Sequence, residues 1–560
     1  MVECLTSVWA RHGRLTSEVT YTESHRNMPR YGATDTGQAL PRRCGRDCNL
    51  AAMEIREVAV VGLGTMGAGI AEVFARAGIG VVALEIDAAA LNRGVGILDA
   101  SLSRAVTKGR LTAAEQAQIR SRVRPAAGFS EAAAVDLAIE VVPERMEIKR
   151  EIFAELDRVC SPDAILATNT SSLSVTAIAA ESKYPGRVVG MHFFNPAPVM
   201  RLVEVVSTVL TTDGVAATVS DLARRLGKTP VQVSDRAGFI ANALLLPYLN
   251  HALHLLATGY ASRADIDLAA TAGIGLPMGP LALLDLIGLD TALSIMEVMH
   301  GEFGLPRYMA TPLLRRLADA GRTGRKAGRG IYDYGDSSAS DNHDQGGNAL
   351  VSAAPDTVTL IGAGDDVEAE LASAMASAGI NVTRNAAHPT DLIVIAAEAG
   401  RPVLPAALAA GRPEQAVGLH LAGKLAPGSL AEVVQTSLSS ADAVEAGTAL
   451  AAKLGLATVR APDRPGFLAG TLLYAHLADA VRMCQDGYAG PTDVDTAMKL
   501  GCGYPRGPFE LIDAAGAASV LTGLEAMHEA YGYPEFAPPP LLAEHAAAGI
   551  AFAASPRPGR

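Results

Sequence analysis

Apolar and polar positions from residue 53 onward follow a pattern of alternating strands and helices. Residues 58–61 form a short apolar run of the kind expected for a buried strand. A glycine-rich turn and a helix-like pattern up to Ala77 come next, and a second apolar run over residues 81–84 ends at Glu85. This order predicts a strand–helix–strand unit with parallel strands.

Further apolar runs lead into polar loops. These runs lie at residues 137–141, 165–167 and 188–193. In an open α/β sheet, ligands bind at the carboxyl ends of the strands. We therefore expect Glu144, Ser171 and His192 to face one crevice, although they lie far apart in the sequence.

The chain becomes helical after Asp235. Helix-like periodicity covers residues 238–258, 263–273 and 279–300, with Gly and Pro residues between these stretches. From Gly335 a stretch rich in Ser, Asp, Gly and Asn is typical of a linker. The residues before Met53 show no hydrophobic period and lack the apolar core of a secretory signal.

The later part of the chain repeats the earlier part at a constant offset, so that Asp463 is the counterpart of Asp235. Residues 234–239 match 462–467, and residues 276–281 match 504–509 at the same offset. The repeat predicts that the helical part is present twice.

The nucleotide-binding part is shorter in the second copy. Residues 358–364 resemble a first strand and its turn, but Val367 stands where a third glycine is needed. Asp365 and Asp366 would repel a phosphate. We interpret this part as a vestige with a structural role.

Composition excludes several classes of protein. The net charge of −12 argues against a nucleic-acid binder, and no apolar run approaches the roughly 20 residues of a membrane span. Six cysteines do not make a disulfide framework and favour a reducing cytoplasm. Cys44 and Cys48 resemble half of a zinc site without a second half, so no metal is predicted.

The glycine-rich turn has the chemistry of a dinucleotide site. Gly62 allows the tight turn, Gly64 lets the backbone approach a pyrophosphate, and Gly67 permits close packing of helix and strand. Glu85 stands where a carboxylate accepts a hydrogen bond from a ribose 2′-hydroxyl. The same carboxylate would repel a 2′-phosphate, so NAD is favoured over NADP.

A histidine stands twelve residues before a glutamate in both copies, as His192 with Glu204 and as His420 with Glu432. A neutral histidine can take a hydroxyl proton, and a carboxylate on its other nitrogen fixes the tautomer. The alternative is a buried structural histidine with Glu204 at a strand edge.

Residues 53–334 resemble the short-chain L-3-hydroxyacyl-CoA dehydrogenase family. The resemblance rests on several motifs in order. These are residues 62–69 (GLGTMGAG), 140–144 (EVVPE), 168–172 (TNTSS), 192–200 (HFFNPAPVM), 238–242 (GFIAN) and 328–332 (GRGIY). The duplicated form resembles longer bacterial enzymes of phenylacetate and hydroxyacyl-CoA breakdown.

The resemblance implies a role for each matching position. His192 would be the base and Glu204 its orienting partner, while Ser171 and Asn242 would hold the substrate hydroxyl and thioester region. The implied cofactor-binding residues are Gly62, Leu63, Gly64, Thr65, Met66, Gly67, Glu85, Glu144, Lys149, Asn169 and Lys326. Ser101, Lys108 and Ser171 match positions that contact the coenzyme A substrate, and Lys108 lies in a local basic patch with Arg104 and Arg110.

The expected fold is an α/β Rossmann NAD-binding domain, an all-α 6-phosphogluconate-dehydrogenase-like C-terminal domain, a shortened Rossmann-like vestige and a second copy of the helical domain. The expected divisions are 1–52 (disordered leader or mis-assigned start), 53–234 (NAD-binding domain), 235–334 (helical domain), 335–356 (linker), 357–461 (degenerate Rossmann-like segment), 462–535 (second helical domain) and 536–560 (flexible tail).

The second copy departs from the family pattern, because Gly470 replaces Asn242 and Gly423-Lys424 replaces Asn195-Pro196. We expect catalysis only in the first copy, and either a homodimer or an internal pseudo-dimer through the helical domains. The expected reaction is NAD-dependent oxidation of (3S)-3-hydroxyacyl-CoA. The alternatives are a hydroxy-acid dehydrogenase that does not use CoA and a retained scaffold protein without activity.

Overall fold

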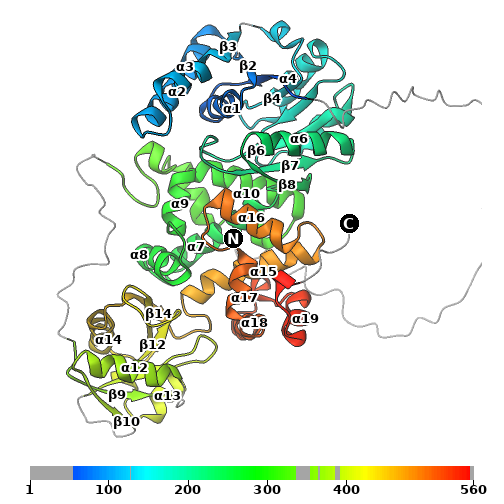
Figure 1. Ribbon diagram of the computed structural model, residues 1–560. Helices are drawn as coiled ribbons and strands as arrows, with labels where there is room; N and C mark the ends of the chain where they lie inside the picture. The colour runs from blue at the N-terminus through cyan, green and yellow to red at the C-terminus, as the bar shows by residue number, and fades with distance from the viewer. Residues whose placement is uncertain (1–53, 127, 336–353, 363–365, 385–390, 555–560) are drawn as a thin grey trace, which may run out of the picture. The chain divides into compact units, whose positions relative to one another are not determined.

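The computed structural model describes residues 54–126, 128–335, 354–362, 366–384 and 391–554 (Figure 1). The expected leader, most of the expected linker, and Cys44 and Cys48 lie outside these residues. No helix in the described ranges has the length and apolar character needed to cross a membrane.

The first sheet has eight strands in the order β3-β2-β1-β4-β5-β6-β7-β8. All neighbours are parallel except β6 and β7, which are antiparallel. The strands are β1 (Glu57–Val61), β2 (Gly80–Leu84), β3 (Val123–Ala126), β4 (Leu137–Glu140), β5 (Ile165–Thr168), β6 (Val188–Phe193), β7 (Leu202–Ser207) and β8 (Thr229–Ser234). The order of the first six strands is that of a Rossmann fold, with the reversal between β1 and β4.

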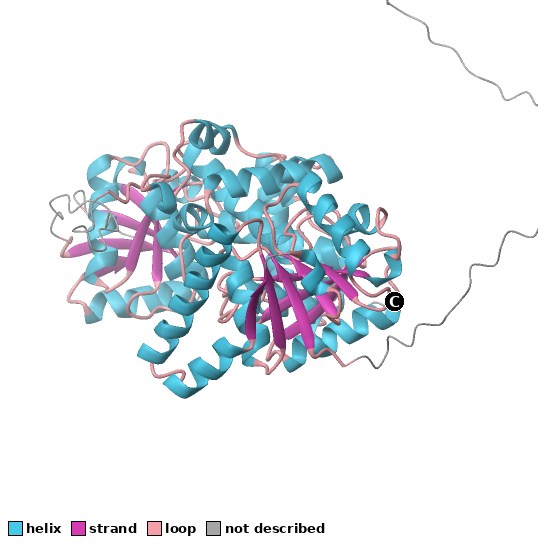
Figure 2. Cartoon of the chain, turned by 90° about the horizontal axis from the view of Figure 1, so that it is seen from above, coloured by secondary structure: helices cyan, strands magenta, loops and turns pink. Residues whose placement is uncertain are grey.

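Helices cover both faces of this sheet (Figure 2). They are α1 (Thr65–Arg76), α2 (Ala88–Thr107), α3 (Ala113–Ser121), α4 (Met146–Val159), α5 (Val175–Ala179) and α6 (Asp213–Arg225). Successive side chains of β1 enter different cores, since Val58 and Val60 belong to one buried cluster and Ala59 and Val61 to the other. Burial on both faces explains the continuous apolar runs of these strands.

The first helical segment, residues 241–327, follows β8. It contains α7 (Ala241–Ala257), α8 (Arg263–Leu268), the π-helical turn η4 (Ala269–Ile274), α9 (Pro280–Ile287), α10 (Leu289–Phe303), η5 (Pro306–Tyr308), α11 (Pro312–Asp319) and η6 (Arg325–Ala327). The helix predicted over 279–300 is two helices, because Gly288 adopts a φ of 103° that breaks the helical path.

The second sheet has six strands in the order β10-β9-β11-β12-β13-β14. The strands are β9 (Thr357–Ile361), β10 (Asn381–Arg384), β11 (Leu392–Ala396), β12 (Ala416–Leu421), β13 (Leu430–Gln435) and β14 (Ala457–Pro462), with helices α12 (Asp366–Ser377), α13 (Leu404–Ala409) and α14 (Ala441–Lys453). Strands β12, β13 and β14 each begin at the repeat counterpart of the first residue of β6, β7 and β8.

The second helical segment, residues 469–554, follows β14. It contains α15 (Ala469–Gln485), α16 (Pro491–Cys502), α17 (Pro508–Ala515), α18 (Ala517–Tyr531), η8 (Pro534–Phe536), α19 (Pro540–Ala548) and η9 (Phe552–Ala554). The prediction of a flexible tail from residue 536 is therefore wrong. Only a few large apolar side chains mark α19, and it is ordered because Leu542 and His545 are buried where it packs on α18.

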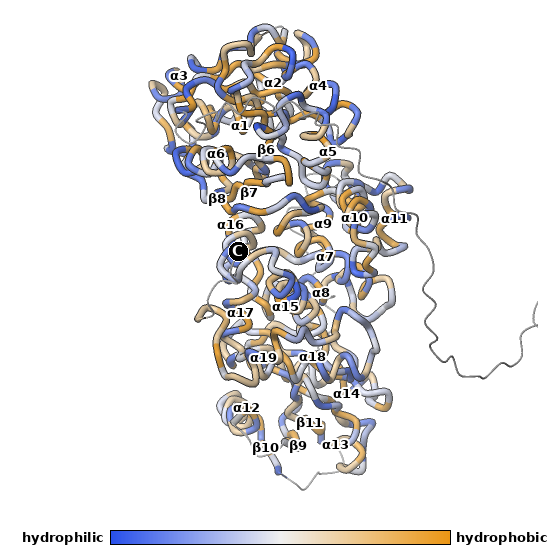
Figure 3. Tube along the Cα trace, turned by 90° about the vertical axis from the view of Figure 1, so that its right-hand side faces the viewer, coloured by the Kyte–Doolittle hydropathy of each residue, from blue (hydrophilic) through white to orange (hydrophobic). Residues whose placement is uncertain are grey.

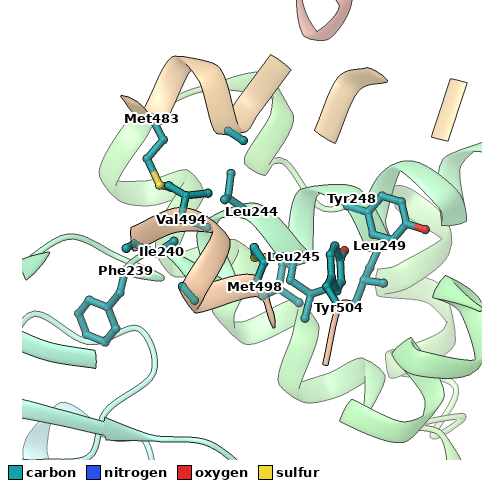
Figure 4. Close-up of a cluster of buried hydrophobic side chains, with 14 of the residues drawn as sticks. Phe239, Ile240, Leu244, Leu245, Tyr248, Leu249, Met483, Val494, Met498 and Tyr504 are labelled. Carbon is teal, nitrogen blue, oxygen red and sulfur yellow. The ribbon is translucent and has the colours of Figure 1, made fainter. Parts of the chain in front are cut away.

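The two helical segments share one core. Helix α7 contacts α15 and α16, and α16 also contacts β7 and β8 of the first sheet, as Figure 3 shows from the side. In Figure 4, Leu244 and Leu245 of α7 lie beside Val494 and Met498 of α16. Helix α7 is apolar around most of its circumference, which a helix can be only when neighbours cover it on all sides.

Candidate active site

His192 and Glu204 meet across two antiparallel strands. They are directly paired in the register of β6 and β7, and His192 Nδ1 lies 2.7 Å from Glu204 Oε2. The separation of twelve residues is explained by the antiparallel pairing of β6 and β7. The loop over residues 194–201 reverses the chain, so that the two side chains lie opposite each other. A carboxylate only accepts hydrogen bonds, so Nδ1 carries the proton and donates.

The other oxygen of Glu204 is held by the start of α7. Oε1 accepts hydrogen bonds from the backbone N–H groups of Ile240 at 3.0 Å and Ala241 at 3.1 Å. Phe239, just before them, has a φ of 47°, which turns the chain from β8 into the helix. The carboxylate is completely buried, and the positive end of the helix stabilises its charge.

The other nitrogen of His192 faces Ser171. Nε2 lies 3.2 Å from Ser171 Oγ, and Asn242 Nδ2 donates to the Ser171 carbonyl over a long 3.5 Å. The imidazole ring lies between Phe194 and Phe239, with ring centroids 4.5 and 5.5 Å away. The structure thus brings together His192, Glu204, Ser171 and Asn242.

The glycine-rich turn after β1 is sterically closed at two of its glycines and open at the third. A Cβ on Gly67 would lie 1.7 Å from the Gly62 carbonyl oxygen, and one on Gly62, whose φ is 95°, would lie 2.8 Å from the Val141 oxygen. A Cβ on Gly64 would meet nothing within 4 Å. Gly62 and Gly67 are therefore required by the fold, and Gly64 borders space that a ligand can enter.

Glu85, at the end of β2, lies beside this turn. Its Oε1 accepts from Leu63 N at 2.6 Å and its Oε2 from Ile86 N at 3.0 Å. Thr65 and Met66 begin α1, so their N–H groups belong to the unpaired set at a helix N-terminus, which suits a phosphate. These donors and the carboxylate fit the pyrophosphate and adenosine ribose of NAD.

Glu144 organises the loop after β5. Its Oε1 accepts from Thr170 Oγ1 at 2.5 Å, Ser171 N at 2.9 Å and Ser172 N at 3.1 Å. Burial raises the pKa of Glu144, but Lys149 and the hydrogen bonds from Thr170 and Ser171 outweigh it, so that the pKa lies below its ordinary value. Glu144 is therefore an anion that fixes the backbone beside Ser171.

Lys149 is not a surface residue of the cofactor site. Its side chain is completely buried, and its ammonium lies 2.9 Å from Glu140 Oε1 and 3.3 Å from Glu144 Oε2. The charge of an isolated buried lysine would be costly, and these two carboxylates compensate it. Lys149 thus contacts Glu144, the carboxylate that holds the backbone of Ser171.

The remaining predicted residues are dispersed. Asn169 Oδ1 accepts from Phe193 N at 2.8 Å and ties the β5 loop to β6. Ser101 is half-buried on α2, Lys108 is exposed at the C-terminal end of the same helix, and Lys326 is exposed on η6. In the described ranges no hydrogen bond or ion pair joins Ser101, Lys108 or Lys326 to the His192 pair.

The second sheet holds a matching pair without its neighbours. His420 Nδ1 lies 2.7 Å from Glu432 Oε2, and Glu432 Oε1 accepts from Leu468 N and Ala469 N at 2.8 and 2.9 Å. Ala399 is the repeat counterpart of Ser171, and Gly470 is that of Asn242. No hydroxyl therefore faces His420 from the equivalent loop position.

Lys228 is a residue that sequence reasoning missed. Its ammonium donates to the carbonyls of Ala197 at 2.6 Å and Met200 at 2.7 Å, and so fastens the loop between β6 and β7. Burial, with the nearby charges of Arg76 and Arg201, lowers the pKa of Lys228 to about 8. No motif marks this lysine, because its partners are backbone groups that a sequence pattern does not reveal.

Comparisons with known proteins agree on one family. Residues 57–236 match the family model "3-hydroxyacyl-CoA dehydrogenase, NAD binding domain". Residues 238–334 and 466–557 both match "3-hydroxyacyl-CoA dehydrogenase, C-terminal domain". The two stretches that match the C-terminal model coincide with the two helical segments.

Relatives match either the whole chain or its first half. The 3-hydroxyadipyl-CoA dehydrogenase of Escherichia coli (strain K12) is 34% identical over 88% of this chain and 98% of its own length. The 3-hydroxybutyryl-CoA dehydrogenase of Clostridioides difficile is 46% identical over 50% of this chain and 99% of its own. A crystal structure of 3-hydroxybutyryl-CoA dehydrogenase from E. coli K12 has a TM-score of 0.73 at 33% identity and covers 89% of this chain and 99% of that one.

The glycine turn yields a first prediction. Gly64→Ala should keep the melting temperature of the wild type but weaken NADH binding by about tenfold, because its methyl group enters the space open to the pyrophosphate. Gly67→Ala should lower both the melting temperature and the affinity for NADH, because its methyl group would overlap the carbonyl oxygen of Gly62. Fluorescence titration with NADH and thermal melting measure the two effects. Gly301→Ala, on an exposed turn of α10 with open space, is the control, and wild-type NADH affinity in Gly64→Ala would contradict the assignment.

Lys228 yields a pH prediction. Its pKa in the folded protein, about 8, is below the ordinary 10.5, so the unfolded chain binds more protons between these values. The contribution of Lys228 to the free energy of unfolding is therefore fully present above pH 10.5 and is lost as the pH falls through 8. The free energy of unfolding of the wild type, minus that of Lys228→Met, should rise from pH 8 to 10.5 in urea titrations. If the difference in free energy of unfolding between the two proteins does not change with pH, the lowered pKa of Lys228 is refuted.

Proposed function

The chain belongs to the 3-hydroxyacyl-CoA dehydrogenase family, and we propose that it catalyses (3S)-3-hydroxyacyl-CoA + NAD⁺ ⇌ 3-oxoacyl-CoA + NADH + H⁺. One observation carries the proposal: Ser171, His192, Glu204 and the start of α7 form a continuous hydrogen-bonded chain beside a dinucleotide-binding turn.

His192 acts as the general base. Because Nδ1 donates to Glu204, Nε2 of the neutral ring is free to accept the proton of the substrate hydroxyl. Glu204 then stabilises the imidazolium. Two backbone N–H groups hold the other oxygen of Glu204, so the carboxylate cannot turn away from His192. A base of this kind contributes about 10²–10⁴-fold to the rate.

Ser171 and Asn242 orient the substrate. Ser171 Oγ lies 3.2 Å from His192 Nε2, so a substrate hydroxyl placed against this nitrogen also meets the serine hydroxyl. Asn242 contacts the Ser171 backbone and stands at the first turn of α7, where its amide suits the thioester carbonyl. Together they would hold the carbinol carbon in one orientation.

The Gly62–Gly67 turn and Glu85 would hold NAD, which would supply the acceptor for the hydride of the carbinol carbon. The residues of the chain supply binding and proton transfer. The Glu85 carboxylate suits a ribose 2′-hydroxyl and disfavours the 2′-phosphate of NADP.

The CoA part of the substrate is assigned to α2. Ser101 and Lys108 are seven residues apart, which is two helical turns, so they lie on one face of this helix. Arg104 and Arg110 add positive charge nearby, which an acidic protein needs in order to attract the phosphates of CoA. The acyl group is either short, as in 3-hydroxybutyryl-CoA, or carries a terminal carboxylate, as in 3-hydroxyadipyl-CoA, because relatives bear both names.

We infer that residues 357–554 are a shortened second copy of residues 57–327. The constant offset between matching residues supports this. So do the contacts of Asp235, which accepts from Val175 N and Thr176 N, and of Asp463, which accepts from Val403 N and Leu404 N. Among the described residues of this part, the six-stranded sheet has no strand at the positions equivalent to β3 and β4, which is consistent with a degenerate nucleotide-binding part.

Reciprocal contacts favour an internal pseudo-dimer. Tyr488 OH donates to the Ser234 carbonyl at 2.9 Å, and Tyr260, its counterpart in the first copy, donates to the Phe467 carbonyl at 2.6 Å. Tyr488 of the second half thus binds the end of β8, and Tyr260 of the first half binds the turn that precedes α15. The free thiols of Cys160, Cys484 and Cys502 are compatible with the cytoplasmic location that we propose.

Matched histidine variants test the proposal. His192→Gln should lower kcat by about 10²–10⁴-fold with 3-hydroxybutyryl-CoA and NAD⁺. His420→Gln removes the equivalent ring beside an equally buried carboxylate and should keep kcat within about twofold of the wild type, because no complete catalytic set surrounds it. The absorbance of NADH measures turnover, and thermal melting checks that both variants fold.

Full turnover by His192→Gln would refute the mechanism, and loss of turnover by His420→Gln would refute the single active site. A panel of 3-hydroxyacyl-CoAs of four, six and eight carbons, an adipyl-type substrate and free 3-hydroxy acids separates the alternatives. Activity on free acids alone would favour a dehydrogenase that does not use CoA. Inactivity of the wild type on the whole panel would favour a scaffold protein.

A further inference from the structure

Gly501 lies at a close contact between the second helical segment and the first sheet. It lies near the C-terminal end of α16, the helix that packs on α7 and β7. A Cβ at this position would lie 2.6 Å from Leu202 Cδ2 and 3.1 and 3.3 Å from the ring carbons Cε1 and Cζ of Phe194. A side chain here would therefore require the Leu202 methyl group and the Phe194 ring to shift.

The residues that Gly501 touches lead directly to the catalytic pair. Phe194 follows the last residue of β6, and its ring lies 4.5 Å from the His192 ring, centroid to centroid, at an angle of 51°. Leu202 begins β7, two residues before Glu204. Phe194 thus lies between the backbone of α16 and the imidazole, so its position depends on both.

The same helical segment also fastens the chain that holds Glu204. The Arg236 guanidinium lies between the rings of Phe303 and Tyr488, 4.6 and 4.8 Å from their centroids. Arg236 precedes the two N–H groups that bind Glu204, and Tyr488 belongs to the turn between α15 and α16. Burial raises the pKa of the Cys502 thiol, and the nearby negative charge of Glu204 raises it further.

We propose that Gly501 is a positioning residue for His192, and that the second helical segment supports the active site of the first copy through Phe194. The inference rests on the proposed function and extends it, because it assigns a role in catalysis to a part of the chain without a complete catalytic set. A side chain at position 501 would displace the Phe194 ring or the Leu202 methyl group, and displacement of the Phe194 ring would reach the His192 ring that it contacts.

Gly273 provides a matched control. It is the counterpart of Gly501 in the first copy, and its Cβ would lie 2.6 Å from Leu430 Cδ2, 3.4 Å from Ala469 Cβ and 3.7 Å from Ala422 Cβ. Leu430 and Ala422 are the counterparts of Leu202 and Phe194 in the second sheet. A methyl group at Gly273 therefore crowds the same kind of interface, but no aromatic ring transmits the displacement to a histidine.

The experiment compares Gly501→Ala and Gly501→Val with Gly273→Ala and Gly273→Val in the full chain. We expect kcat per folded enzyme to fall about tenfold in Gly501→Ala and about 10²-fold in Gly501→Val, because small misplacements of a base have large effects on rate. The KM for NAD⁺ should stay within about twofold, since the glycine turn is elsewhere. Both Gly273 variants should keep wild-type kcat even where their melting temperature falls.

Two readouts separate positioning from a general loss of structure. With substrate deuterated at C3, the primary isotope effect on kcat should rise in the Gly501 variants, because hydride transfer becomes more rate-limiting; a smaller folded fraction would leave it unchanged. In a Phe194→Leu background, Gly501→Ala should have less than half of its effect on kcat, because the transmitting ring is absent.

Equal kcat in the Gly501 and Gly273 variants would overturn the inference, as would an undiminished effect of Gly501→Ala in Phe194→Leu. These outcomes are distinct from failure of the proposed function, in which the wild type itself does not turn over 3-hydroxyacyl-CoA.

Discussion

The structure of the first half depends on one buried negative charge. The Glu204 carboxylate has no exposed surface, so every one of its interactions must come from the protein. His192 supplies one from the neighbouring strand, and the amides of Ile240 and Ala241 supply two from the helical segment. The charge therefore joins the sheet, the turn at Phe239 and α7 into one unit, and it sets the orientation of the imidazole at the same time.

The same constraint explains how a histidine–glutamate pair can remain where catalysis is not expected. Glu432 is as buried as Glu204 and binds the start of α15 in the same way. Removing His420 would leave this charge with one hydrogen-bond donor fewer, which costs about 1.5–3 kcal/mol for a bond to a charged group. Ala399 and Gly470 are the counterparts of Ser171 and Asn242 in the second copy. Neither Ser171 nor Asn242 carries a charge, so their replacement leaves no buried charge without a partner. The contacts of Glu432 with His420 and with the start of α15 give the pair a structural role.

The order of apolar runs predicted five of the eight strands of the first sheet, but not β3, β7 or β8. It also predicted that Glu144, Ser171 and His192 lie together at the strand ends, and hydrogen bonds join Ser171 to both of the others. The catalytic pair was also predictable, because its spacing recurs. The burial of Lys149, the anchoring by Lys228 and the contact of Gly501 with Phe194 were not. Each depends on residues that are far apart in the sequence and meet only after folding, through hydrogen bonds to backbone groups or through van der Waals contacts. Such contacts leave no local sequence pattern. The helix α19 was missed because only a few large apolar side chains mark it.

The contact between α16 and Phe194 has a further consequence because both belong to one chain. An equivalent contact between separate molecules would be lost on dilution. Here the contact is intramolecular, so its equilibrium does not depend on the protein concentration, and the connecting chain sets the effective concentration of the two sides. A protein built in this way remains assembled at any cellular abundance. Within the chain the two halves differ in sequence, so substitutions on the two sides of their interface can accumulate separately.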